Sequence, residues 1–265
     1  MPRKIFSWRD AYPIWQLILA FLFINALMLM PISVRMQSLE TVSLQDYFPK
    51  AMALLDNKVL SSLQDLEVDE ASGKLQIQAS QEISTKGDAV VTFDENSLDQ
   101  ASKSLEGKTG VVFTPEGFVL AESQLPSIQQ TYKNPLTIVE ATSVQSLQET
   151  LSQQWFQDNR MAVIMSRILN VCFLLTVSNL IFVLGSAGFL SLMKHYRKFD
   201  IANYTEAVAI ALMCLGLPTL IAVALGFWRL NPLDMMTVQG LGFVVMLIGT
   251  FWVTHFNDDF NKRGA

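Results

Sequence analysis

The chain has 265 residues, of which 51% are hydrophobic and 16% are charged, and its formal net charge is −5. The apolar residues are collected into runs that are too long for a soluble core, which is the composition of a polytopic membrane protein. This composition excludes an ordinary soluble enzyme as the class of protein.

Four stretches are apolar over enough residues to cross a membrane, since a helix that spans about 30 Å of hydrocarbon needs about 20 such residues. We therefore predict an α-helical polytopic membrane protein with four transmembrane helices and an inserted α+β extracytoplasmic domain between helices one and two. In chain order the predicted segments are a cytoplasmic amino-terminal flank (1–13), transmembrane helix 1 (14–34), the extracytoplasmic domain (35–160), transmembrane helix 2 with an outer helical extension (161–193), a cytoplasmic basic loop (194–206), transmembrane helix 3 (207–228), an outer loop (229–234), transmembrane helix 4 (235–253) and a cytoplasmic tail (254–265).

The first apolar stretch follows Arg3, Lys4 and Arg9, a charge pattern that also precedes the apolar part of a signal peptide. The stretch is longer than that apolar part usually is, and "MPISVRMQS" offers no small-x-small cleavage site. We therefore predict an anchor that is not cleaved.

The segment 35–160 combines short strands of alternating apolar residues with amphipathic helices. We predict a small antiparallel sheet with helices at its edges. The first predicted element is a helix with Phe48, Met52, Leu55 and Val59 on one stripe, followed by a hairpin at 66–79 around Ser72 and Gly73 and by a strand at 89–93. A helix comes next, with a capping box of Ser97 and Gln100 and with Gly107 just past its end, and then two strands around the turn at 114–117. The last elements are a strand at 136–141 and a helix with a capping box of Thr142 and Gln145 that continues without a break into the second span.

Lysine and arginine in the short flanking segments set the orientation, because these residues are retained on the cytoplasmic side. They lie before the first span, between the second and third spans, and after the fourth. We therefore predict a plasma-membrane protein with both termini in the cytoplasm and residues 35–160 outside. This outer segment holds 18 acidic and 9 basic residues, so it is a poor ligand for nucleic acid or anionic lipid. We predict membrane lipid, and no nucleic acid, as a partner of the chain.

The chain has two histidines, His195 and His255, and both fall at the predicted cytoplasmic face. The two cysteines, Cys172 and Cys214, belong to the spans and are predicted to be small apolar packing residues at different depths. The outer segment therefore cannot assemble a Ser-His-Asp triad, a Cys-His nucleophile or the usual zinc shell. We predict no catalytic residues, no metal site and no cofactor.

Chemistry that uses only carboxylates remains an alternative, with Asp65, Asp69, Asp94 and Glu95 as its candidate residues. The stretch 65–70 is not a calcium loop, because Glu70 stands where the turn glycine is needed and Gln76 stands where the last glutamate is needed. These acids lie among other acids and turn residues, so we predict most of them to be exposed, without a shared cleft.

A second alternative makes the outer domain a sensor for a glycan or envelope ligand, since sugar recognition favours aromatic platforms. The aromatic residues that bear on it are Phe93, Phe113, Phe118, Trp155 and Phe156. Most of them alternate with other apolar residues in predicted strands or helices, so we expect them in the core.

Ionisable and polar residues near the spans are few. Arg167 is predicted to reach the outer headgroups, and Glu206 suits the N-terminus of the third span. Hydrogen bonds between helices are the expected role of Asn25, Asn170, Asn179 and Gln239. Small residues at 185–191 and the pair Ala222 and Gly226 favour close helix contact, within the chain or with a partner.

The order of these segments, together with "VVTFDENS", "GVVFTPEGFVL" and "YTEAVAIALMCLGLPTLI", resembles the MalA/YvdJ-like family of maltodextrin-utilisation membrane proteins of Gram-positive bacteria. The resemblance implies a plasma-membrane protein associated with the ABC importer for maltose and maltodextrins, with the importer's permease subunits as partners. It supplies no catalytic or binding residue. The expected function is a non-enzymatic accessory or regulatory subunit of that import; the sensor and a carboxylate-dependent envelope enzyme are the alternatives.

Overall fold

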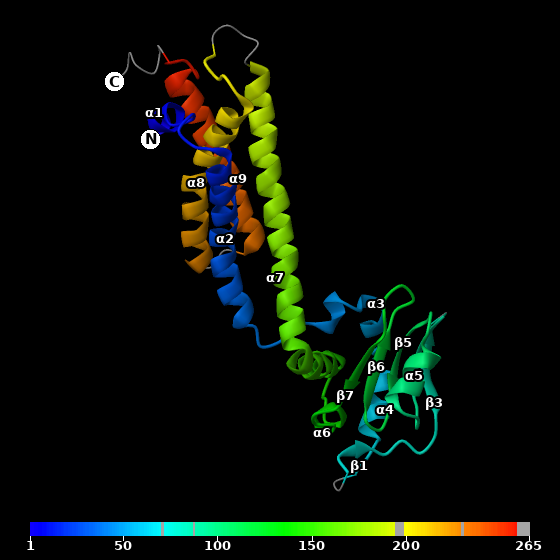
Figure 1. The fold of residues 1–265 in the computed structure, drawn as a ribbon. Helices are drawn as coiled ribbons and strands as arrows, with labels where there is room; N and C mark the ends of the chain where they lie inside the picture. The colour runs from blue at the N-terminus through cyan, green and yellow to red at the C-terminus, as the bar shows by residue number, and fades with distance from the viewer. Residues whose placement is uncertain (70–71, 87, 194–198, 229–230, 259–265) are drawn as a thin grey trace. The chain divides into compact units, whose positions relative to one another are not determined.

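The computed structural model describes residues 1–69, 72–86, 88–193, 199–228 and 231–258 (Figure 1). The chain divides into two compact units. The helical unit consists of Met1–Ser38 and Ile164–Ala265, and the sheet unit consists of Leu39–Val163. Each unit has its own hydrophobic core, and each is described separately below.

Four helices in the described part of the chain are long and apolar enough to cross a membrane, as predicted. They are α2 (Ile14–Gln37), α7 (Val144–Met193), α8 (Tyr204–Trp228) and α9 (Pro232–Thr254). Helix α7 is continuous over 50 residues and runs from the sheet unit into the helical unit, which agrees with the predicted continuation of this helix into the second apolar stretch. A short helix, α1 (Pro2–Ser7), precedes α2.

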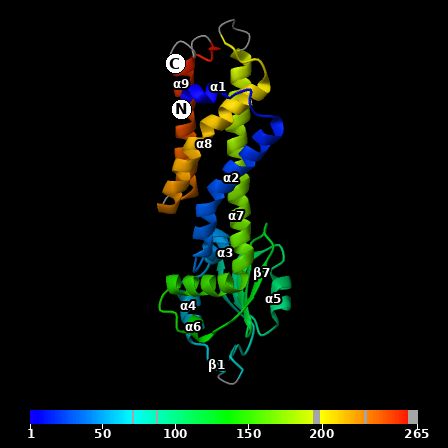
Figure 2. The ribbon, with the colours of Figure 1, turned by 60° about the vertical axis from the view of Figure 1, so that its left-hand side comes forward.

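Within the helical unit, α8 packs against both α2 and α9 (Figures 1 and 2). A Cβ atom added at Gly242 would lie 2.8 Å from Cβ of Pro218, and one added at Gly226 would lie 2.6 Å from Sδ of Met235. The Ala222 and Gly226 pair therefore makes the predicted close contact within the chain. A Cβ at Gly185 would meet nothing within 4 Å, so this glycine of the other small-residue stretch makes no such contact with the described residues.

The sheet unit contains a five-stranded sheet in the order β3-β4-β5-β6-β7. Its strands are β3 (Gln81–Lys86), β4 (Ala89–Phe93), β5 (Thr109–Phe113), β6 (Gly117–Ala121) and β7 (Ile128–Thr131). Strands β4 and β5 are parallel and are joined by helix α5 (Leu98–Ser104), whereas the other neighbours are antiparallel. The prediction of a purely antiparallel sheet is therefore wrong, because a helix crossover returns the chain in the same direction.

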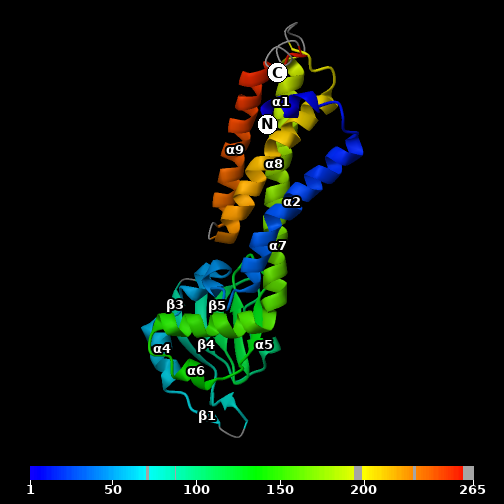
Figure 3. The ribbon, with the colours of Figure 1, turned by 90° about the vertical axis from the view of Figure 1, so that its left-hand side faces the viewer.

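Helices cover both faces of this sheet, and its core lies between them and the strands (Figure 3). Ala101 of α5 and Leu105, the residue that follows α5, pack with Val112 and Val119 on one face. On the other, α3 (Pro49–Met52) contacts β5, while α4 (Asn57–Gln64) contacts β3. The predicted hairpin is the short pair β1 (Val68–Asp69) and β2 (Lys74–Leu75), with Gly73 at a positive φ of 64°.

The strand predicted at 136–141 is wrong, because residues Leu136–Val139 form helix α6. Pro135 already has helical dihedral angles, and its carbonyl accepts from the backbone N–H groups of Ile138 and Val139. The buried side chain of Ile138 can therefore reach the core from a helical turn. The edge of the sheet is formed instead by β7, whose residues "IQQT" carry little strand signal.

The single helix predicted around Phe48 to Val59 is also wrong, although its four stripe residues are all buried. The structure has a 3-10 turn η1 (Leu44–Asp46), then α3, then α4. The chain is extended at Asp56, whose carboxylate accepts from the N–H groups of Lys58 and Val59 at 3.0 Å. This side chain therefore starts a second helix rather than continuing the first.

Two of the predicted helix caps differ in detail. Ser97 precedes α5 but its side chain makes no capping hydrogen bond. At the start of α7, Ser143 rather than Thr142 is the capping residue, because its hydroxyl accepts from the N–H of Ser146 at 3.1 Å. Gly107 has a φ of 74° and follows α5, as predicted.

Candidate functional site

The four candidate carboxylates of the sheet unit do not come together. Asp65 and Glu95 are exposed, and Asp69 and Asp94 are half-buried. Asp94 accepts hydrogen bonds from Ser80 Oγ at 2.9 Å and from Asn96 Nδ2 at 2.7 Å, so it holds a turn together. Asp65 lines an open cleft of about 520 Å³, and the other three are not among its described lining residues.

The five candidate aromatic residues are all buried, as expected of core residues. Phe93 and Phe113 meet edge to face with ring centroids 5.9 Å apart, and Trp155 lies 5.3 Å from Tyr47. These rings fill the core, so they do not present a platform for a sugar ring.

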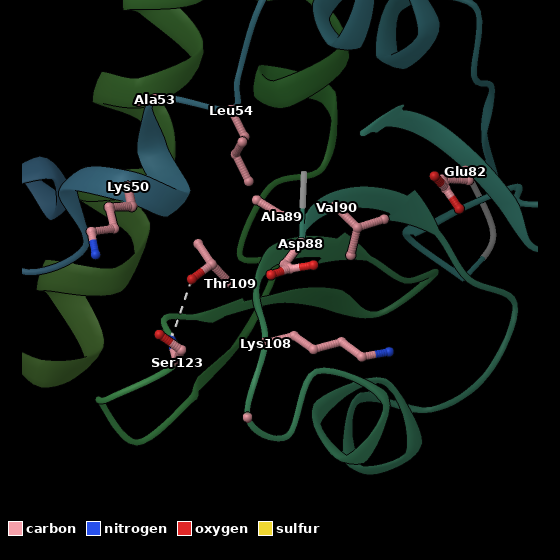
Figure 4. Close-up of a pocket in the computed structure, with 11 residues that line it drawn as sticks. Lys50, Ala53, Leu54, Glu82, Asp88, Ala89, Val90, Lys108, Thr109 and Ser123 are labelled. Carbon is pink, nitrogen blue, oxygen red and sulfur yellow. Dashed lines mark hydrogen bonds between the residues drawn. The ribbon is translucent and has the colours of Figure 1, made fainter. Parts of the chain in front are cut away.

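The sheet unit contains an open cleft of about 1000 Å³ at one end of the strands (Figure 4). Lys50 and Leu54 come from α3 and the turn that follows it, while Asp88 and Lys108 precede β4 and β5. Sequence reasoning missed this cleft because its lining residues come from segments far apart in the chain and form no motif.

Glu122, next to the cleft, fixes one of its walls. This buried carboxylate accepts from the backbone N–H groups of Lys50 at 2.6 Å and of Ala51 at 3.1 Å, so it satisfies the first N–H groups of α3. Across the end of the sheet, the N–H of Ser123 donates to Thr109 Oγ1 at 3.3 Å. The chain on either side of the cleft is thus tied to β5 and β6.

The described lining residues of the cleft supply charged groups and apolar surface. Lys50 and Lys108 are basic, Glu82 and Asp88 are acidic, and Leu54 with Val90 is apolar. This combination can bind a polar ligand. Among the described residues, no three His, Cys, Asp or Glu side chains lie close enough to hold a metal ion.

A second cluster, which we call the Arg9 clasp, consists of Arg9, Glu206 and Asp258 in the helical unit. The guanidinium of Arg9 donates to Asp258 through Nη1 at 3.0 Å and Nη2 at 2.9 Å, and through Nε to Glu206 at 3.3 Å. It also lies 4.1 Å from the ring centroid of Phe6, in a cation–π contact. The clasp therefore joins the residues before α2, the start of α8 and the residues after α9.

The charge balance of the clasp favours the charged form of its arginine. Burial is the largest single influence on the pKa of Arg9 and lowers it, but hydrogen bonds and charge attraction from Asp258 and then Glu206 outweigh burial and raise the pKa above its ordinary value. Glu206 lies in the first turn of α8, as predicted, and also accepts from the N–H of Ala202 at 3.0 Å. Its pairing with Arg9 was not predicted.

Hydrogen bonds between the apolar helices follow the prediction for three of four polar residues. Asn179 Nδ2 donates to Asn25 Oδ1 at 3.0 Å, and Gln239 Nε2 donates to Thr219 Oγ1 at 2.7 Å. Asn170 is exposed instead. Both cysteines are free thiols. His195 and the basic residues at 194–198 lie outside the described residues.

Comparison with known proteins extends over nearly the whole chain. Maltodextrose utilization protein MalA of Streptococcus pneumoniae is 28% identical over 97% of this chain and 92% of its own length. Putative maltodextrin utilization protein YvdJ of Bacillus subtilis is 23% identical over 94% of this chain and 85% of its own length. No solved structure matches the chain.

The family described as "Protein of unknown function (DUF1189)" matches residues 12–256. This range includes the four membrane-length helices of the described residues and the whole sheet unit. The chain therefore belongs to the DUF1189 family, and the two maltodextrin-utilisation proteins are its homologues.

Proposed function

We propose that this protein is a non-enzymatic accessory or regulatory membrane subunit associated with ABC import of maltose and maltodextrins. The observation that carries the proposal is similarity over nearly the full length to two proteins named for maltodextrin utilisation. In this proposal the protein lies in the plasma membrane with both termini in the cytoplasm and residues 35–160 outside, beside the permease subunits of the importer.

The described side chains support binding and regulation better than catalysis. The candidate carboxylates are dispersed, and residues 35–160 contain neither histidine nor cysteine. A glycosidase would need one carboxyl of raised pKa about 5–10 Å from a second carboxylate. An enzyme that uses Asp65, Asp69, Asp94 and Glu95 together is therefore disfavoured.

A contact inside the sheet unit supports a regulatory role. Gln130 of β7 donates to Asp158 of α7 at 2.5 Å, and Lys133 pairs with the same carboxylate at 2.5 Å. The helix held in this way continues as the second membrane-length helix. A ligand that displaced β7 would therefore act directly on a helix that leaves the sheet unit.

Co-purification tests the accessory role. A tagged full-length chain would be extracted in mild detergent from cells grown on maltodextrin, with an unrelated tagged four-span protein as the control. We expect the importer's permease subunits to co-purify with this chain and not with the control protein. Deletion of the gene for this chain should reduce maltodextrin uptake. Absence of the permeases together with unchanged uptake would refute the proposal.

The alternative function is an extracytoplasmic sensor or binding module for a glycan or envelope ligand, and the 1000 Å³ cleft favours it. Calorimetry of the full chain in detergent, with maltodextrins as the probe, tests direct binding of sugar. Lys50→Ala and Lys108→Ala should weaken any binding severalfold, whereas Lys58→Ala on α4 should leave it unchanged. The absence of any heat of binding at millimolar maltodextrin would exclude direct sensing of sugar by this chain.

A further inference from the structure

Three segments that are far apart in the sequence meet at one end of the helical unit (Figure 2). They are residues 1–9, which contain α1, residues 199–206, which lead into α8, and residues 254–258, at and after the end of α9. Helix α1 packs against both α8 and α9. We call these three segments the end cap, and contacts of three kinds join them.

The first kind of contact is apolar. Phe6 of α1 lies against Phe256, with ring centroids 5.9 Å apart, and both residues are at most 2% exposed. Ile5 and Ile201 belong to the same buried cluster. The second kind is the Arg9 clasp, which ties residues 1–9 to the other two segments.

The third kind consists of hydrogen bonds around the turn that follows α9. The N–H of Phe256 donates to Thr254 Oγ1 at 3.2 Å, and the Phe256 carbonyl accepts from the N–H of Asp200 at 2.8 Å. The carboxylate of Asp200 in turn accepts from the N–H of Asp258 at 2.8 Å. Because Asp258 also holds Arg9, these contacts link all three segments.

The turn inside the end cap is strained. His255 and Phe256 have positive φ angles of 50° and 47°, in the left-handed region. Side chains with a Cβ atom are disfavoured there, and residues visit this region singly rather than in succession. Two such residues in a row persist only while the surrounding contacts hold them. The contacts of the end cap therefore oppose a local tendency of the turn to open.

Helix α1 is either docked or unfolded. It has only six residues, and among the described residues no side chain caps its first turn. A helix shorter than about 12 residues is not stable alone in water, so α1 is helical only while it is docked. Pro13, extended at φ −68° and ψ 156°, separates α1 from α2, so α1 can detach and unfold while α2 stays intact.

We propose that the end cap is a two-state latch. In the closed state α1 is docked, and Phe6 and the Arg9 clasp hold the turn at 255–256 in its left-handed conformation. In the open state residues 1–9 are unfolded, the turn adopts unstrained dihedral angles, and the start of α8 is no longer tied to the end of α9. Such an order–disorder transition is a known switching element. The latch belongs to the helical unit and does not depend on the function proposed above.

Hydrogen–deuterium exchange of the full chain in mild detergent, read by mass spectrometry, tests the latch. Peptides from the three segments should share one protection factor, lower than that of peptides from the middle of α8. Arg9→Ala should speed exchange in all three segments by the same factor, about tenfold or more. Lys4→Ala, exposed on the same helix, is the matched control and should leave their exchange unchanged.

A second pair of variants tests the strain, with the opposite sign. His255 is exposed, so its side chain can be replaced without disturbing the packed core. His255→Gly relieves the strain, because glycine adopts a positive φ readily. It should slow exchange in all three segments about threefold relative to His255→Ala, which removes the same ring but keeps the Cβ atom.

Three results would overturn the latch. Unrelated protection factors would show that the three segments do not open as a unit. Protection equal to that of α8 would show that the end cap opens only when the whole helical unit unfolds. Equal exchange in the two His255 variants would show that no strain is released on opening, even if Arg9→Ala could not be purified in a folded form.

Discussion

Arg9 and Asp258 are 249 positions apart in the chain, yet they form a two-pronged ion pair at 3.0 and 2.9 Å. The pair joins the segment before α2 to the segment after α9. Glu206 adds a third group, and the side chains of Arg9 and Glu206 are only 11% and 12% exposed. The ends of the described chain are therefore held together by charge as well as by apolar packing.

Replacing Arg9 should destabilise the helical unit. Arg9→Ala leaves two carboxylates without their cation, one of them largely buried, and should cost roughly 2–3 kcal/mol. Arg9→Lys keeps the charge but loses the two-pronged geometry, so it should cost about half as much. Thermal unfolding in detergent would measure both, with Lys4→Ala as the exposed control. Equal melting temperatures for Arg9→Ala and the control would contradict this role.

Asp158 should make the sheet unit less stable in acid. The hydrogen bond from Lys133 is the main reason why the pKa of Asp158 is lowered, although partial burial opposes it and Gln130 adds to it. A lowered folded-state pKa gives stability that is present above the unfolded value of about 3.9 and is lost as the pH falls through the folded value.

This contribution should be below about 1 kcal/mol, because the carboxylate is 37% exposed and solvent screens it. Asp158→Asn should remove it, so the difference in unfolding free energy between wild type and variant should shrink from pH 7 to about pH 3. Urea unfolding followed by tryptophan fluorescence would measure the difference. Asp65→Asn is the comparison, and a difference for Asp158→Asn that does not change with pH would count against the pairing.

Gly242 should tolerate no side chain. A Cβ atom there would lie 2.8 Å from Cβ and 3.1 Å from Cγ of Pro218, and a proline ring cannot turn aside. Gly242→Ala should therefore separate α8 from α9 and cost about 1–3 kcal/mol. Gly249→Ala, in the same helix, meets nothing within 4 Å and should be neutral or slightly stabilising. Similar melting temperatures for the two variants would show that this helix contact is looser than described.

Cysteine labelling in intact cells tests the proposed orientation. In a background without Cys172 and Cys214, a membrane-impermeant thiol reagent should label single cysteines at Ser72 and Glu116, which are exposed in the sheet unit. It should spare a cysteine at Ser7 until the cells are opened. Labelling at Ser7 from outside would reverse the proposed orientation of the first helix.

The elements that sequence reasoning found are those whose signal is local. The four apolar helices follow from length and composition, and the strand at 89–93 follows from its β-branched residues and the turn that follows it. The helix at 136–139 was missed because its apolar residues fit either element, and only its packing decides between them.

The sites required information that is not local. The 1000 Å³ cleft gathers Lys50, Asp88 and Lys108 from separate segments, and Arg9 reaches its partners only when both ends of the helical unit are folded. Neither arrangement has a spacing that a single sequence displays. The burial of the five aromatic residues, by contrast, was predictable from their alternation with apolar neighbours.

The two hydrogen bonds that Glu122 accepts from Lys50 and Ala51 set the width of the cleft on that side. Because Glu122 directly follows β6 and precedes Ser123, the wall that carries Lys50 and the wall that carries Ser123 cannot move apart without breaking them. The cost of ordering this wall is therefore met during folding, so a ligand of the proposed sensor would find that side of the cleft already shaped. On that side, a bound molecule would have to fit the wall that carries Lys50 rather than displace it.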